Sequence, residues 1–159
     1  MIYCSSQNDE AMEDQKKVKY ESLYTQVKAL LEDERNLIAN MANLSAAIYA
    51  EFKYHWVGFY RVDGEELVLG PFQGPVACTR IAKGKGVCGT AWAKKKTLIV
   101  DNVHDFPGHI ACSPYSLSEI VIPIEKEGQV IAVLDIDSDQ YSSFNEVDDF
   151  YLSAILALL

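Results

Sequence analysis

The sequence contains no apolar run long enough to span a membrane, and the stretch from Met1 to Lys19 lacks the apolar core of a signal peptide. We therefore expect a cytoplasmic protein with no membrane partner. Basic residues are scarce, because 14 Lys and Arg stand against 23 Asp and Glu and leave a net charge of −9. An acidic chain repels nucleic acid on average, so no nucleic-acid partner is expected.

Motifs for metal binding and serine catalysis are also absent. The chain has no C-x-x-C or H-x-x-x-H pair, which structural zinc sites nearly always use, and no nucleophile elbow. We therefore expect no metal, and a zinc site built from several cysteines and a histidine ranks low. The chain has 4 cysteines, Cys4, Cys78, Cys88 and Cys112. In a reducing compartment they are buried thiols, ligands or redox catalysts rather than a disulfide framework.

The chain reads as one globular domain behind a polar arm. With 159 residues, 9 Gly and 5 Pro, and no repeat or low-complexity segment, it is typical of an ordinary single domain. Residues 1–19 are polar and predict a flexible N-terminal arm, which leaves 20–159 as the single domain. Apolar residues then recur every three or four positions from Tyr20 to Leu31 and from Ile38 to Phe52, which predicts two amphipathic helices.

The remaining pattern predicts an α+β fold with six strands. Aromatic and β-branched runs predict strands near residues 56–62, 67–69, 75–81, 97–100, 119–124 and 130–136. Asp63-Gly64 and Glu127-Gly128 predict antiparallel hairpin turns at the two ends of this series. A short helix fits between Gly86 and Lys95, and a last helix starts at Asn145 as N-cap with Asp148 three residues later.

A long segment between Val100 and Ser118 has no clean periodicity and carries two of the 3 histidines together with Cys112. Loops of this length in a compact domain are usually functional, so we expect an active-site flap. Cys112 would then be a reactive thiol, with His109 three residues earlier favouring its thiolate. The alternative is a loop thiol packed against the body of the domain.

Cys88 lies in a glycine-rich turn, Gly84-Lys-Gly-Val-Cys-Gly89. This matches a dinucleotide fingerprint, but such folds need a parallel sheet, and the hairpins predicted on both sides argue against one. A position in the first turn of a helix, with Lys83 and Lys85 close in sequence, favours a thiolate at Cys88. The alternative is a buried, inert core thiol.

Acidic and aromatic residues gather on the predicted strands. Glu119 opens one strand and Asp135-Ile-Asp137 closes another, so that the two aspartates share a face. If three carboxyl groups met near a pocket, their repulsion would raise at least one pKa and leave a protonated acid at neutral pH. Otherwise they are solvated strand ends. Trp56 and Tyr60 share one strand face and otherwise belong to an ordinary aromatic core.

Several blocks together resemble the free methionine-(R)-sulfoxide reductase family of single GAF-domain enzymes. They are Trp56-Val-Gly-Phe-Tyr60, Gly70-Pro-Phe-Gln-Gly74-Pro-Val-Ala-Cys78, the Gly84–Gly89 turn, Val100-Asp-Asn-Val-His104, Ala111-Cys112-Ser113, Ser118-Glu119-Ile-Val-Ile-Pro123 and Leu134-Asp135-Ile-Asp137-Ser138. The likeness covers nearly everything after Tyr20. It implies a GAF-like, six-stranded antiparallel sheet with helices packed on its faces.

The same resemblance implies the roles of eight residues. Cys112 would be the nucleophile, Cys88 the main resolving cysteine and Cys78 an auxiliary or alternative resolver. Substrate contacts would fall on the remaining five residues, Trp56, Tyr60, Glu119, Asp135 and Asp137. The local sequence favours Cys88 as the thiol of lower pKa, whereas the family places the first attack at Cys112, and we follow the family because proximity to substrate outranks thiolate fraction.

The expected reaction reduces free methionine sulfoxide through a Cys112 sulfenic acid and a Cys112–Cys88 disulfide. Thioredoxin would restore the thiols, no cofactor is expected, and the family implies a homodimer. The runner-up is a sensing GAF module that binds a small molecule such as a cyclic nucleotide without catalysis. A dinucleotide-dependent oxidoreductase ranks third and a structural zinc protein fourth.

Overall fold

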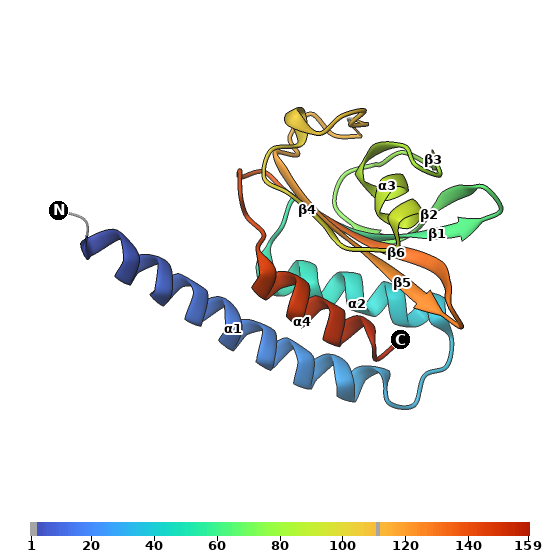
Figure 1. Cartoon of the computed structure of the whole chain (residues 1–159). Coiled ribbons are helices and arrows are strands. Elements are labelled where there is room, and N and C mark those ends of the chain that lie inside the picture. Colours follow the sequence, from blue (N-terminus) through green and yellow to red (C-terminus); the bar gives the residue numbers. More distant parts are fainter. Residues whose placement is uncertain (1–2, 111) are drawn as a thin grey trace.

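In the computed structural model, one α+β body carries a long N-terminal helix (Figure 1). The structure describes residues 3–110 and 112–159, with side chains from residue 10 onward; Met1, Ile2, Ala111 and the Cys4 side chain lie outside the described residues. The helices are α1 Tyr3–Leu31, α2 Leu37–Phe52, α3 Gly86–Lys94 and α4 Glu146–Leu156, with a 3-10 turn η1 at Val103–Asp105. The strands are β1 Trp56–Asp63, β2 Glu66–Gln73, β3 Arg80–Ala82, β4 Leu98–Val100, β5 Ser118–Lys126 and β6 Gln129–Ser138.

The strands form one antiparallel sheet of six strands in the order β3-β2-β1-β6-β5-β4. Strand β1 therefore pairs with β6, although the two lie at opposite ends of the sheet-forming sequence. The expected α+β fold with a six-stranded antiparallel sheet is confirmed. Its two hairpin turns also form where the sequence places them, before Glu66 and before Gln129.

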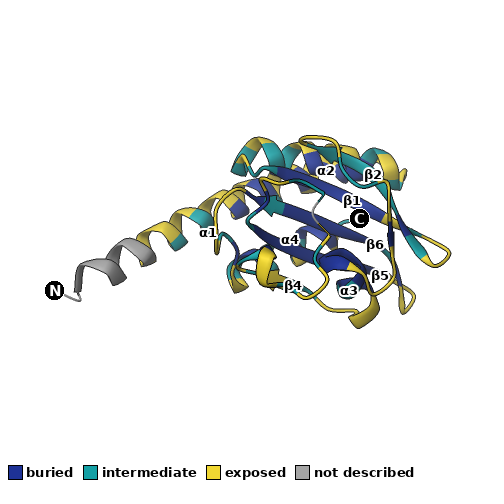
Figure 2. Ribbon diagram, turned by 90° about the horizontal axis from the view of Figure 1, so that it is seen from above, coloured by how far each residue is buried: buried dark blue, intermediate teal, exposed yellow. Residues whose placement is uncertain are grey.

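The two faces of the sheet have different coverings. Helices α1, α2 and α4 lie on one face. Helix α3 lies on the other face with residues 101–110 and 112–117, which we call the flap (Figure 1). Because side chains alternate along a strand, Ile120 and Ile122 point into the core under α1, α2 and α4, whereas Val121 points toward α3. The central strands are buried on both sides (Figure 2).

The N-terminal helix differs from the sequence expectation. Helix α1 begins at Tyr3, whereas the polar composition predicts an arm up to residue 19. The polar residues there include good helix formers. Lys17 and Glu13, which are one helical turn apart, form an ion pair at 3.0 Å that stabilises the helix. An apolar stripe is therefore needed only where α1 meets the body, from Tyr20 onward.

Asp148 joins α1 to α4 at a fully buried position. Its carboxylate accepts hydrogen bonds from Tyr20 Oη and Lys16 Nζ, each at 2.6 Å. It also accepts one from the backbone N–H of Asn145 at 2.8 Å, which completes the capping box expected at the start of α4. Asp148 therefore adds a buried polar contact to the apolar packing of α1 on the body.

One predicted strand is largely wrong. Of the expected strand at 75–81, only Arg80 and Ile81 pair with β2, in a strand that ends at Ala82, and the residues before Arg80 are irregular. Pro75 has no N–H to donate to a neighbouring strand, and its carbonyl instead accepts a hydrogen bond from Trp56 Nε1 at 3.1 Å.

None of the helices in the described ranges is long and apolar enough to cross a membrane.

Candidate active site

A small cavity lies on the α3 face of the sheet, between the strands, the start of α3 and the flap. Seven of the eight sequence-predicted site residues line it: Trp56, Tyr60, Cys88, Cys112, Glu119, Asp135 and Asp137. The eighth, Cys78, is joined to Cys112 by a disulfide. The fold thus brings together residues that are as far apart as 81 positions in the sequence, from 56 to 137.

One wall of the cavity is aromatic. The Trp56 ring stacks between Tyr60 and Phe72, with ring centroids 5.9 Å and 5.3 Å away. Gly58 makes this possible, because a Cβ there would collide with the Trp56 ring and with Phe72. The Tyr60 hydroxyl donates to the Cys78 carbonyl at 3.0 Å, so Tyr60 also fixes the irregular segment that carries Cys78.

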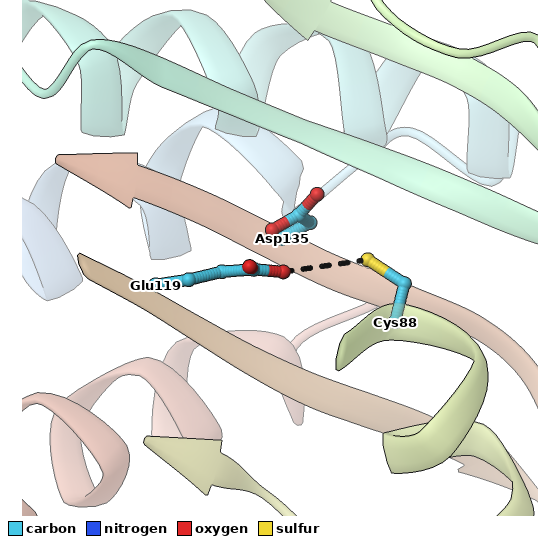
Figure 3. A group of neighbouring side chains, drawn as sticks. All are labelled: Cys88, Glu119 and Asp135. Carbon is cyan, nitrogen blue, oxygen red and sulfur yellow. Dashed lines mark hydrogen bonds between the residues drawn. The ribbon is translucent and has the colours of Figure 1, made fainter. Parts of the chain in front are cut away.

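The three carboxyl groups lie beside this aromatic wall, since Trp56 pairs with Asp137 in the register of β1 and β6. In the register of β5 and β6, Glu119 lies directly opposite Asp137, and Asp135 lies two residues along the same face. Figure 3 shows the side chains of Glu119 and Asp135 converging with that of Cys88, whose Sγ donates to Glu119 Oε1 at 3.9 Å. Within the part of the chain that the structure describes, Asp135 Oδ1 is buried with no hydrogen-bond partner.

Burial and mutual repulsion hold protons on these groups. Burial raises the pKa of both Glu119 and Asp135 well above the ordinary range, and the neighbouring carboxylates raise it further. Burial also raises the pKa of Asp137 to about 6, although a hydrogen bond with Ser116 acts in the opposite direction. The cavity therefore retains at least one proton at neutral pH, as expected from three carboxyl groups that meet.

The environment of Cys88 contradicts the expectation of a low thiol pKa. Burial, and then the charges of Asp135 and Glu119, raise its pKa well above the ordinary value. The two lysines that were to favour a thiolate do not contact it: Lys83 Nζ lies 4.8 Å from the centre of the Trp92 ring, and Lys85 is exposed. Desolvation and two acidic neighbours outweigh the start of one short helix.

The disulfide also differs from the expected pairing. Cys112 is bonded to Cys78, with 5.5 Å between their Cα atoms, whereas Cys88 is a free, buried thiol. The expected Cys112–Cys88 disulfide is therefore wrong for this structure. The reason is tertiary: Cys78 lies on the irregular segment next to the flap, while the Cys88 side chain points toward the carboxyl groups (Figure 3).

Comparison with known proteins identifies the family. The GAF domain family model matches residues 29–159. A curated relative from Escherichia coli (strain K12), named free methionine-R-sulfoxide reductase, is 44% identical over 141 residues, which are 88% of this chain and 86% of the relative. The chain belongs to the free methionine-R-sulfoxide reductase family of GAF domains.

Two further proteins that this chain resembles cover similar lengths. GAF domain-containing protein A of Dictyostelium discoideum is 60% identical over 145 residues, 91% of this chain and 92% of the relative. The crystal structure of the free methionine-R-sulfoxide reductase of Neisseria meningitidis in complex with its substrate has a TM-score of 0.88 and 47% identity, and covers 90% of this chain and 87% of that one.

For this member of the reductase family, sequence reasoning missed three residues around the cavity. His55 Nε2 and Ser113 Oγ are hydrogen-bonded at 2.9 Å, and Ser113 and Ser116 line the cavity. His55 stands directly before the aromatic strand β1, and Ser113 directly after Cys112. Their adjacency to predicted site residues was the one available signal.

The cavity also contains donors that suit a metal ion. Ligand atoms of Cys88, Glu119 and Asp135 lie within 4.8 Å of one another. The zinc site considered from the sequence combined Cys78, Cys88, Cys112 and a histidine. It shares only Cys88 with this group, because Cys78 and Cys112 are paired with each other here. The dinucleotide reading of the Gly84–Gly89 turn is excluded by the antiparallel sheet.

Proposed function

We propose that this protein reduces free methionine-R-sulfoxide to methionine by thiol chemistry at the cavity. The observation that carries the proposal is the Cys78–Cys112 disulfide at a cavity that is also lined by three carboxyl groups of raised pKa. A redox pair beside proton-bearing acids is what reduction of a sulfoxide requires. The names of the relatives in E. coli and N. meningitidis support the same substrate.

Substrate binding uses the aromatic wall and the carboxyl groups. The S-methyl group packs on Trp56, and the ammonium group of the amino acid meets Asp135, whose Oδ1 has no hydrogen-bond partner within the described ranges. The charge of the bound ammonium group opposes the upward shift of the Asp135 pKa and favours the ionised form, which gives a charge-assisted bond. A peptide-bound methionine sulfoxide lacks the ammonium group and would leave this buried carboxylate unpaired, so the site favours the free amino acid.

In the first chemical step, the Cys112 thiolate attacks the sulfoxide sulfur. A protonated carboxyl group, Glu119 or Asp137, donates its proton to the sulfoxide oxygen and makes the sulfur more electrophilic. The oxygen passes to Cys112 as a sulfenic acid and methionine leaves, so that sulfur in the substrate is reduced and sulfur in Cys112 is oxidised. Cys88 contributes a hydrogen bond to Glu119.

In the second step, the Cys78 thiol condenses with the Cys112 sulfenic acid, which releases water and forms the disulfide of the structure. A dithiol donor such as thioredoxin then restores both thiols by exchange. This cycle suits the reducing cytoplasm, and the chain is proposed to work as a homodimer.

A single-turnover experiment tests the assignment. The protein is reduced, freed of reductant and mixed with excess free R or S sulfoxide or with a sulfoxide-containing peptide, and methionine is measured. We expect about one methionine per chain, with the free R isomer only. Cys112→Ser should release none, and Cys78→Ser should release one and leave a sulfenic acid that dimedone traps.

Cys4→Ser is the matched control, because it removes a thiol from the N-terminal helix and should leave the yield unchanged. Methionine release by the Cys112→Ser protein would refute the assignment of the nucleophile. No release by the wild-type protein, together with tight binding of a cyclic nucleotide, would favour the sensing function instead.

A further inference from the structure

The residue directly after Cys112 is hydrogen-bonded to the residue directly before Trp56. His55 Nε2 and Ser113 Oγ lie 2.9 Å apart, and both side chains are half-buried. Ser113 Oγ also accepts the backbone N–H of Tyr115 at 3.2 Å, and the Tyr115 ring lies edge-on to the His55 ring with centroids 6.0 Å apart. The flap thus rests on the start of β1 at the point where that strand enters the cavity.

Other described contacts leave this part of the flap loosely held. Between His109 and Tyr115, the described hydrogen bonds other than that of His55 stay within the flap, for example from Cys112 N to Ile110 O at 3.0 Å. Ile110 packs on Gly86, where a Cβ would lie 3.3 Å from its side chain, but Ile110 itself is exposed. The remaining tie to the body is the Cys78–Cys112 disulfide.

That disulfide is absent in the state that reacts. When both cysteines are reduced, the covalent tie between the flap and the segment before β3 is lost, and Cys112 must still be held over the cavity. Among the described contacts next to Cys112, the His55–Ser113 hydrogen bond joins the flap to the body without involving either cysteine.

We propose that His55 is a positioning residue that anchors Ser113 and thereby keeps the reduced Cys112 thiol over the cavity and within reach of Cys78. The proposal rests on the proposed function for its effect on turnover. Holding a nucleophile in place reduces the entropy that is lost when it reacts. One hydrogen bond of ordinary net strength changes the fraction of molecules with Cys112 in the reactive position by roughly two- to tenfold.

The test uses three variants of the full chain. His55→Phe keeps a ring beside Tyr115 but removes the hydrogen bond, Ser113→Ala removes it from the other side, and His55→Gln restores a polar group near the position of Nε2. Asp105→Asn is the matched control, since it weakens an exposed flap hydrogen bond, Asn102 Nδ2 to Asp105 Oδ2 at 2.9 Å, that does not adjoin Cys112. Urea unfolding of each variant verifies that the fold is retained.

Two readouts are measured on the reduced proteins. His55→Phe and Ser113→Ala should each slow single-turnover methionine release roughly two- to tenfold at saturating substrate, with the half-saturating concentration unchanged. The same variants should speed alkylation of the Cys112 peptide by iodoacetamide by a similar factor, measured by mass spectrometry. His55→Gln should recover most of both rates, and the double variant should behave like either single one.

Wild-type rates in His55→Phe, or effects that multiply in the double variant, would overturn the positioning role. Failure of the proposed function gives a different result: the wild-type protein would then release no methionine, whereas the alkylation rates would still separate His55→Phe from the Asp105→Asn control.

Discussion

Replacing Asp137 by asparagine should stabilise the protein at neutral pH while leaving its stability in acid almost unchanged. Burial raises the pKa of Asp137 from an ordinary 3.8 to about 6, so the folded state holds this proton more tightly than the unfolded chain does. The stabilisation from that proton is fully present below pH 3.8 and is lost as the pH rises through about 6.

The magnitude follows from the shift. Two pKa units at about 1.4 kcal/mol each give a difference of about 3 kcal/mol between acid and neutral pH. An asparagine cannot ionise, so the free energy of unfolding of Asp137→Asn minus that of the wild type should rise with pH. Between pH 4 and pH 7 we expect about 2.4 kcal/mol of this difference, because at pH 4 the unfolded carboxyl group is already partly ionised. Relief of repulsion on Asp135 and Glu119, whose pKa values Asp137 raises, acts in the same direction.

Urea unfolding at half-unit steps from pH 4 to pH 8 measures this difference. Asp139→Asn is the control, because it removes the same charge from an exposed position just beyond β6 and should give a nearly flat difference. A flat difference for Asp137→Asn as well would refute the reasoning, since it would mean that the Asp137 carboxyl is as well solvated in the folded protein as in the unfolded one.

Two further predictions concern stability. The Cys78–Cys112 disulfide spans a sequence separation of 34. Loop-closure entropy therefore predicts that reduction lowers the free energy of unfolding by about 4 kcal/mol. Equal urea midpoints for the oxidised and the reduced protein would contradict this prediction. Asp148→Ala leaves Lys16 and Tyr20 without their partner and should cost about 3 kcal/mol in the same assay, whereas a cost under about 1 kcal/mol would show that α1 docks by its apolar stripe alone.

The sequence predicted most of the fold because its signals are local. The spacing of apolar residues located α2 and the body-facing half of α1, and the Asn145 capping box located α4. Turn chemistry located both hairpins. The start of α1 was not predicted, because a polar helix without an apolar stripe has no periodic signal, and its ties to the body are single contacts such as that of Lys16 with Asp148.

The candidate site was predicted residue by residue through the family resemblance, but its chemistry was not predicted in full. Local sequence around Cys88 shows a helix start and lysines, whereas the carboxyl groups that raise its pKa come from β5 and β6. The disulfide partner of Cys112 likewise depends on where an irregular segment lies in space. Both properties are set by strand register and tertiary packing, which short sequence windows do not contain.

Gly58 has a consequence for reading other sequences of this fold. The Trp56 indole packs directly over the backbone of Gly58, so a Cβ at this position would collide with the ring and displace it. A tryptophan followed two residues later by glycine at the start of the first strand therefore marks a chain that can keep an indole against the sheet. In a GAF sequence that has a tryptophan at the position of Trp56, an alanine or larger residue two positions later would displace the indole from the place it takes here.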